Sequence, residues 1–325
     1  MPRDPERGAA LLTVLLLVAV ISVLAATGLE RLRLSTRLAG NAAAIGQARA
    51  YAHAVETLAL TRIDALLGPR PERVTLAGGW SGRPFALPLP GGGAATARVA
   101  DGGNCFNLNG LVTRTPSGEY VAEGAQVAIL ARLMRLTGVP AATAEQVANG
   151  AADWIDSDDR TGFQGAEDAA YLRGETPYRT PGAPMADPTE LRAVAGVTPD
   201  LYRRVRRWLC THPAAEPSRI NVNTLLPEQG PLLAMLFPDT MSPEAAAQHL
   251  LRRPAQGWGD VSAFLNGPSA AGLVTPFQQQ LDVRTRWFAL RVDVAQGGTG
   301  VEERALVDAN RLPARLVSRQ WGEES

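Results

Sequence analysis

The chain has 325 residues, of which 32 are basic and 32 are acidic, so its formal net charge is zero. This length leaves room for two domains beyond a membrane anchor, and the balanced charge disfavours a nucleic-acid-binding protein, which would favour a basic domain. Every basic residue is an arginine. The absence of lysine excludes a phosphate-binding P-loop and Schiff-base catalysis by a lysine amine.

The first predicted element is an apolar helix close to the N-terminus. Residues 9–29 carry no charged side chain and are long enough to cross a bilayer, which takes about 20 residues. Gly8 ends a short charged leader, and a cut between Gly8 and Ala9 would leave the apolar helix on the mature chain, unlike the cut of a secretory signal. This arrangement resembles the leader of type IV pilins and type II secretion pseudopilins, which prepilin peptidase cleaves after the glycine.

Two other interpretations of this segment stay open. It could be an ordinary signal anchor, or a secretory signal cut near the small residues Ala25 and Ala26. Arginines lie on both sides of the apolar run, so the positive-inside rule does not fix the orientation. The pilin-like leader would place the N-terminus in the cytoplasm and the remainder outside the inner membrane.

Helical periodicity continues well past the membrane segment. Apolar residues recur at helical spacing up to Leu66, and Gly68 and Pro69 then end the pattern. The sequence therefore predicts one long helix over residues 9–68. Glycines at positions 28, 40 and 46 each weaken it by about 1 kcal/mol, so local melting is expected there.

The rest of the chain alternates between strand and helix signals. Short strands are predicted around residues 74–76, 85–87 and 97–100, and a hairpin over 282–294 and 302–307 turns at Gly297 and Gly298. Between them, helices are predicted over residues 123–137, 143–155, 189–195, 199–209, 227–237, 243–251 and 260–265. The expected fold class is α+β. The long helix would pack on a small antiparallel sheet formed by residues 69–122 and 282–325, with a mostly helical domain, 123–281, inserted between the strands.

The two cysteines, Cys105 and Cys210, fit one disulfide in an oxidising compartment. Such a bridge would close a long loop and stabilise the fold by roughly 4–5 kcal/mol. Two buried free thiols are the alternative.

Six carboxylates fall within sixteen residues, beginning in the last turn of the second predicted helix, with glycines among them. They are Asp153, Asp156, Asp158, Asp159, Glu167 and Asp168. Calcium takes six to eight oxygen ligands on a flexible loop, and without a cation such carboxylates would raise one another's pKa values. The spacing is not that of an EF-hand. A solvated acidic loop is the plain alternative, and a catalytic carboxylate pair lacks any accompanying nucleophile.

The sequence also contains a pattern similar to helix-hairpin-helix DNA-binding modules. A helix, Gly196 and a second helix are followed by the segment INVNT at residues 220–224, but Thr198 stands where the second hairpin glycine would be. Arginines at positions 203, 204, 206 and 207 form the only nearby basic run. The alternative is that Asn221, Asn223 and Thr224 cap the next helix and satisfy turn backbone groups.

Taken in order, several segments resemble the general secretion pathway protein K family, the large minor pseudopilin of type II secretion. The segments are ERGAALLTVLLLVAVISVLA (6–25), NCFNLNGLV (104–112), DWIDSDD (153–159) with GAED (165–168), PYRTPGAPMADPTELRAVAGVTPDLY (177–202) and INVNT (220–224). The resemblance implies cleavage after Gly8, methylation of Ala9, and calcium bound by the acidic cluster. It implies a single-pass inner-membrane protein with most of the chain in the periplasm.

The resemblance also implies a role and partners. The chain would sit at the tip of the periplasmic pseudopilus and help to initiate its assembly, in contact with minor pseudopilins I and J, and by extension with H and the major pseudopilin G. Most pilin-like subunits carry Glu at the fifth mature position, where this chain has Thr13. A subunit without that Glu can occupy the front of the filament. No catalytic residue and no nucleic-acid partner is predicted; the alternative function is a minor pilin of a DNA-uptake or adhesion pilus.

Overall fold

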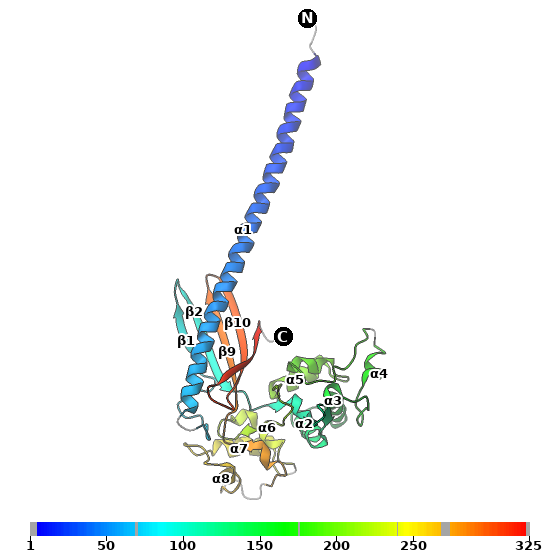
Figure 1. Cartoon of the computed structure of the whole chain (residues 1–325), viewed down its shortest axis with the longest axis vertical. Helices are drawn as coiled ribbons and strands as arrows, with labels where there is room; N and C mark the ends of the chain where they lie inside the picture. Colours follow the sequence, from blue (N-terminus) through cyan, green and yellow to red (C-terminus); the bar gives the residue numbers. More distant parts are fainter. Residues whose placement is uncertain (1–4, 69–70, 175, 239, 268–273, 323–325) are drawn as a thin grey trace.

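A long helical stem carries two packed units. The computed structural model describes residues 5–68, 71–174, 176–238, 240–267 and 274–322. A small sheet lies along the distal half of the stem, and a wider, mostly helical unit lies beyond it, at the end away from the N-terminus (Figure 1). The described hydrophobic residues form two separate cores, one for each unit.

The stem is the single helix α1, Pro5–Leu67, of 63 residues. No proline lies between Pro5 and Pro69, and Gly68 N–H donates to the carbonyl of Asp64 (2.8 Å) where the helix ends. The helix is continuous through Gly28, Gly40 and Gly46, so the expected local melting at these glycines is not present.

The two halves of α1 have different surroundings. Apolar side chains of the first half are exposed, from Leu11 to Leu38. In the second half, small and branched side chains are buried against the sheet at spacings of three to four residues, namely Ala48, Ala52, Val55, Ala59, Ile63 and Leu67. The alanines have little bulk, so the helix backbone can approach the strands closely.

The sheet has five antiparallel strands in the order β1-β2-β9-β10-β11. Their bounds are β1 Phe85–Leu89, β2 Gly93–Asp101, β9 Trp287–Gln296, β10 Thr299–Asp308 and β11 Arg315–Trp321. One face packs on α1 through residues such as Val99, Leu290 and Val292. The predicted hairpin is present as β9 and β10, so strands from both ends of the chain form one sheet.

The helical unit is built from short elements around its own core. Its helices are α2 Gly124–Leu136, α3 Ala141–Ile155, α4 Asp168–Tyr171, α5 Pro199–Val205, α6 Gly230–Ala234, α7 Pro243–Leu251 and α8 Val261–Leu265. Its 3-10 turns are η1 Leu108–Leu111, η2 Pro188–Ala193, η3 Arg206–Trp208, η4 Pro227–Gln229 and η6 Gln278–Gln280. Its two-stranded pairs are β3 Phe106–Asn107 with β6 Leu209–Cys210, β4 Val112–Arg114 with β5 Tyr120–Ala122, and β7 Ile220–Asn221 with β8 Leu281–Asp282. Every predicted helical range contains helix.

The first domain boundary differs from the prediction. Residues 104–122 were expected in the sheet domain, but Phe106, Leu108, Leu111 and Val112 are buried in the core of the helical unit. The reason is long-range: β3 pairs in parallel with β6, about a hundred residues later in the chain. The helical unit therefore begins directly after β2.

The second boundary shifts slightly, and one predicted strand is absent. β8 pairs with β7 inside the helical unit, so the C-terminal strands of the sheet begin at Trp287 and not at residue 282. Residues 74–76 form no strand. Val74 N–H instead donates to the carbonyl of Val283 (2.8 Å), and the nearby Gly78, Gly79 and Gly82 all have positive φ, which turns the chain away from an extended path.

Candidate metal centre

Three carboxylates of the acidic cluster converge on one point. One ligand oxygen from each of Asp153, Asp156 and Glu167 lies within 4.8 Å of the others, and all three side chains are at least nine-tenths buried. Asp153 belongs to the last turn of α3, Asp156 directly follows that helix, and Glu167 precedes α4. The loop between α3 and α4 thus returns Glu167 to the helix end.

Two glycines in that loop hold the Asp153 carboxylate. The Gly162 N–H lies 3.1 and 3.0 Å from the two oxygens of Asp153 and donates to them. A Cβ atom on Gly165 would lie only 2.0 Å from Asp153 Oδ2, which no side chain can tolerate. Gly162 therefore binds the Asp153 carboxylate, and Gly165 leaves the space that this carboxylate occupies.

The cluster is short of positive charge. Burial, together with the charges of Asp153 and Asp158, raises the pKa of Asp156 to about 7. Burial and the charges of Asp153 and Asp156 likewise raise the pKa of Glu167 to about 7. Asp156 Oδ1 and Glu167 Oε1 are buried and accept no hydrogen bond. Two buried oxygens without a donor are what a carboxylate cage for a cation presents.

The other predicted members of the cluster lie differently. Asp168 turns away: its oxygens accept from Arg179, from Thr180 N–H (2.9 Å) and from the Thr180 hydroxyl (3.1 Å), and these groups lower its pKa. The structure therefore uses Asp168 to fix the following loop instead of placing it in the cluster. The position of Asp168 next to Glu167 in the sequence suggested that it belongs to the cluster. Its hydrogen-bond partners, Arg179 and Thr180, lie more than ten residues later and could not be read from that position.

Asp158 and Asp159 are exposed at the rim of the cluster. Asp158 Oδ1 accepts from the Arg160 N–H (2.7 Å), while the charges of both residues contribute to the raised pKa of Glu167. They are near enough to act on the centre electrostatically. The donor set is made entirely of carboxylate oxygens, with no imidazole or thiol, which is the chemistry of a calcium site rather than a zinc site.

The cysteines form a disulfide between Cys105 and Cys210, closing a loop with a sequence separation of 105. Buried His212 lies beside it, with Nε2 donating to the carbonyl of Gly102 (3.1 Å) and its ring stacked on Trp287. Both sulfurs are taken up by the bridge, so this group offers no thiolate for a metal.

The buried asparagines of the two asparagine-rich segments are structural. Asn109 Nδ2 donates to the carbonyls of Met185 and His212, and its Oδ1 accepts from Met185 N–H (2.7 Å). The Asn223 side chain donates from Nδ2 to the carbonyl of Trp258 (2.9 Å) and accepts at Oδ1 from the Trp258 N–H (2.7 Å). Asparagines here pair backbone groups that sheet or helix would otherwise satisfy. Sequence reasoning proposed this kind of role for residues 221–224 but did not propose it for residues 104–112.

In the structure, the residues on which the DNA-binding interpretation rests have structural roles. Gly196 has a φ of 82°, and an added Cβ there would meet the side chain of Gln146. The Thr198 hydroxyl caps α5 by accepting from Leu201 N–H (3.2 Å), and Asn221 and Asn223 are buried. The neighbouring arginines are engaged within the chain: Arg203 pairs with Asp200, Arg204 donates to Gly138, and Arg207 lies over Trp208.

At the N-terminus, Gly8 and Ala9 lie within the continuous helix α1. The Thr13 hydroxyl donates to the carbonyls of Ala9 (3.0 Å) and Ala10 (2.9 Å). Its hydrogen-bonding capacity as a donor is therefore used within its own helix. Cleavage after Gly8 and methylation of Ala9 stay predictions. Within the described part of the chain, α1 is the one helix long and apolar enough to cross a membrane.

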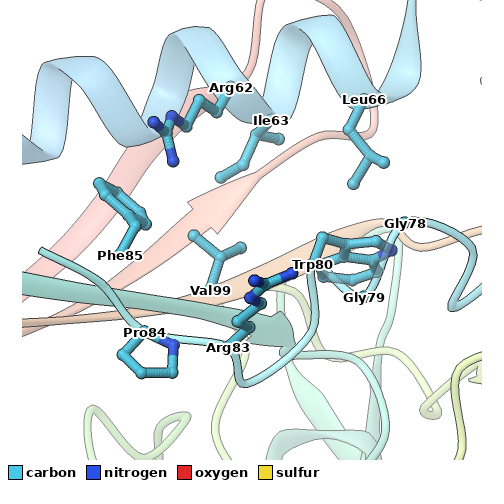
Figure 2. A pocket seen from close by; sticks show the side chains of 10 residues that line it. All are labelled: Arg62, Ile63, Leu66, Gly78, Gly79, Trp80, Arg83, Pro84, Phe85 and Val99. Atoms are coloured by element: carbon cyan, nitrogen blue, oxygen red, sulfur yellow. The ribbon is translucent and has the colours of Figure 1, made fainter.

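A separate cavity of about 430 Å³ lies between the distal end of α1 and the loop before β1. Figure 2 shows Trp80 and Arg83 on one side of it, with Ile63 and Leu66 of α1 on the other. Its full lining is Arg62, Ile63, Leu66, Gly78, Gly79, Trp80, Arg83, Pro84, Phe85 and Val99. This lining has no carboxylate, imidazole, thiol or hydroxyl side chain, so it adds no catalytic candidate.

Comparison with known proteins agrees with this architecture. Residues 104–214 and 220–284 match two family descriptions, both of which read type II secretion system (T2SS), protein K. Together these segments cover more than half of the chain. The chain belongs to the type II secretion system protein K family. The first matched segment begins at residue 104, where the core of the helical unit also begins.

Relatives match over nearly the whole length. The type II secretion system protein K of Klebsiella pneumoniae is 34% identical over 322 residues, which is 98% of this chain and 97% of the relative. That of Pectobacterium carotovorum subsp. carotovorum is 31% identical over 331 residues, 98% of each chain. A GspK chain solved in the GspK–GspI–GspJ complex of enterotoxigenic Escherichia coli has a TM-score of 0.74 and 31% identity, and the match covers 86% of this chain and 96% of that one. The predicted family and fold class are confirmed.

Proposed function

We propose that this minor pseudopilin occupies the tip of the periplasmic pseudopilus of a type II secretion system. There it would help to initiate pseudopilus assembly for protein export across the outer membrane. The observation that carries the proposal is the position of the helical unit, which lies beyond the distal end of the stem and extends to one side of it (Figure 1). A further subunit stacked above this one would need the same space.

The absence of an acidic residue at position 13 supports the front position. A buried carboxylate in a membrane helix is costly and needs a partner, such as the terminal amine of a subunit ahead of it. Thr13 makes its hydrogen bonds within α1 and needs no such partner. A subunit with nothing ahead of it can therefore carry Thr at this position.

The expected partners are minor pseudopilins I and J, since the similar GspK chain was solved in a complex with GspI and GspJ. Beyond the membrane segment, α1 exposes Leu32, Leu34, Leu38 and Ile45 to 66%, 58%, 60% and 40%. Exposed apolar side chains of this kind mark a surface for partner helices. The stems of I and J would cover it, and minor pseudopilin H and the major pseudopilin G would follow along the filament.

The membrane arrangement follows from α1. Its uncharged residues 9–29 would span the inner membrane once, with the N-terminus in the cytoplasm and both packed units in the periplasm. The Cys105–Cys210 disulfide fits that oxidising compartment. Prepilin peptidase would cut after Gly8, and Ala9 would be methylated.

Asp153, Asp156 and Glu167 would hold a structural calcium ion, with Asp158 and Asp159 at the rim. When bound, the ion supplies the positive charge that the three buried carboxylates lack. The protein's own residues orient the site: Gly162 holds Asp153, and the α3–α4 loop delivers Glu167. We assign no reaction to this centre, and the chain acts as a structural component rather than an enzyme.

The proposal is tested in the organism itself by deleting the gene for this chain and measuring the export of type II substrates. Export should stop, and the full chain should restore it. A Gly8→Val chain, whose leader cannot be cut, should not restore it, whereas Gly28→Ala should, because an added Cβ at Gly28 meets open space. A deletion strain that exports normally but no longer takes up DNA would move the chain to a DNA-uptake pilus.

A further inference from the structure

The contact between the stem and the far edge of the sheet contains a second group of metal-ligating side chains. His53 and Glu56 lie one turn apart on α1, and Glu303 faces them from β10. One ligand atom from each of the three lies within 4.8 Å of the others. Residues three apart share one face of a helix, and a Glu-x-x-His pair, which has the same spacing in the opposite order, chelates metal ions in helical bundles.

This group has an unsatisfied, fully buried oxygen. Glu303 is 0% exposed, and its Oε2 has no hydrogen-bond partner. A buried carboxylate oxygen without a donor costs free energy unless a proton or a cation reaches it. Burial and the adjacent Glu56 raise the pKa of Glu303 to about 7.

Arg319 of β11 compensates the two carboxylates only in part. It donates to Glu56 Oε2 through Nε (2.9 Å) and Nη2 (2.6 Å), and to Glu303 Oε1 through Nε (3.3 Å). The guanidinium thus binds one oxygen of each carboxylate and leaves the buried Oε2 of Glu303 without a donor. One positive charge also cannot balance two carboxylates. Arginine bound to ligating carboxylates is compatible with a metal, because such carboxylates are normally hydrogen-bonded themselves.

The group can also be reached from solvent. His53 is exposed, and its ring lies edge-on to Trp321 of β11, with the two ring centroids 5.5 Å apart. Arg49, one turn earlier on α1, lies over the Trp321 ring, with its Cζ 5.3 Å from the ring centroid. The entrance is therefore formed by α1 and the last strand of the sheet.

We propose that His53, Glu56 and Glu303 form a binding site for a divalent metal ion of the zinc type. One imidazole nitrogen and two carboxylate oxygens are ligands that suit zinc, with water in the fourth position. The imidazole separates this site from the all-carboxylate centre on the α3–α4 loop, because calcium takes oxygen ligands. The ion would fasten the stem to β10, so it would set how rigidly the sheet unit is held on α1.

The test is a zinc titration of the full chain in detergent, after chelator dialysis, followed by calorimetry. An Asp153→Asn background keeps zinc from the other carboxylate centre. We expect one zinc ion per chain. His53→Gln and Glu303→Gln should each weaken zinc binding about 10-fold or more. Glu302→Gln is the matched control, since its side chain pairs with Arg291, a partner outside the zinc group, and it should bind zinc like the parent chain.

His53→Gln alone keeps the test decisive, because His53 is exposed and its replacement leaves the core intact even if Glu303→Gln fails to fold. Zinc should also raise the melting temperature of the parent chain and not that of His53→Gln. Undiminished zinc binding by His53→Gln, or no zinc binding by the parent up to about 100 µM, which corresponds to a very weak complex, would overturn the proposal.

Discussion

At the scale of single residues, the buried polar side chains of this protein have specific partners and positions. The acidic centre depends on Asp153, Asp156 and Glu167 being buried together, and on two glycines that leave room for them. The buried asparagines hydrogen-bond to backbone groups of loops that have no partner in a helix or a strand ladder. Side chains in such positions tolerate little change, because a buried group that loses its partner keeps its full desolvation cost.

We expect Gly165→Ala to disrupt the acidic centre without removing a ligand. The new Cβ would lie 2.0 Å from Asp153 Oδ2, so the carboxylate must move. Calcium affinity, measured by calorimetry on the purified chain, should fall about 10-fold or more. Gly174→Ala, just after α4, is the control, since its Cβ meets nothing closer than 3.6 Å. Equal affinities for the two variants would show that the centre does not bind calcium.

His212 gives the fold a defined pH dependence. Burial lowers its pKa from 6.5 to about 4, so between these values the unfolded chain binds a proton that the folded chain does not. The stabilisation is fully present above pH 6.5 and is lost as the pH falls toward 4. His212→Gln should remove this dependence.

Denaturant unfolding at pH 7 and pH 4.5 measures the effect. The parent chain should lose about 2 kcal/mol more than His212→Gln over this range. Asp101, whose burial raises its pKa to about 6, acts with the opposite sign, but it is present in both chains and cancels in the difference. Parallel pH profiles for the two chains would contradict the assignment to His212.

At the scale of elements, local patterns predicted much of the structure. Helical periodicity identified α1, α2 and α3 nearly to their ends, and alternation identified the β9–β10 hairpin. Residues 74–76 alternate as a strand would but lie in a loop, because a single backbone bond to Val283 and three glycines with positive φ decide their path.

What the sequence did not reveal depends on pairings that are distant along the chain. The assignment of residues 104–122 to the helical unit follows from parallel pairing of β3 with β6 and from burial in its core. The position of Asp168 is decided by Arg179 and Thr180. The three converging members of the acidic cluster were among the six predicted residues. The run of acidic residues in the sequence indicated a cation site, but it did not indicate which of the six side chains converge.

The contact between α1 and the sheet relies on small side chains. Ala52 is fully buried there, so Ala52→Leu should force the helix from the strands and lower the free energy of unfolding by about 1–3 kcal/mol. Ala54→Leu, at an exposed position on the same helix, should change it little. Chemical denaturation of the two variants gives the comparison, and equal stabilities would show that α1 is held loosely.

At the scale of the whole molecule, two units share one stem. The sheet unit sits along the stem in the manner of a pilin-like subunit, and the helical unit adds bulk only at the distal end (Figure 1). The first half of α1 exposes apolar side chains along its whole length, which a bilayer and partner helices would cover. A subunit of this shape can lead a filament, and its exposed stem needs neighbours below the head.

The most direct test is to co-express the full chain with minor pseudopilins I and J of the same organism and to purify through a tag on this chain, with calcium and with a chelator. We predict a stable complex with one copy of each protein and with the calcium content lost in an Asp153→Asn chain. Absence of I and J from the purified material under both conditions would contradict the tip assignment.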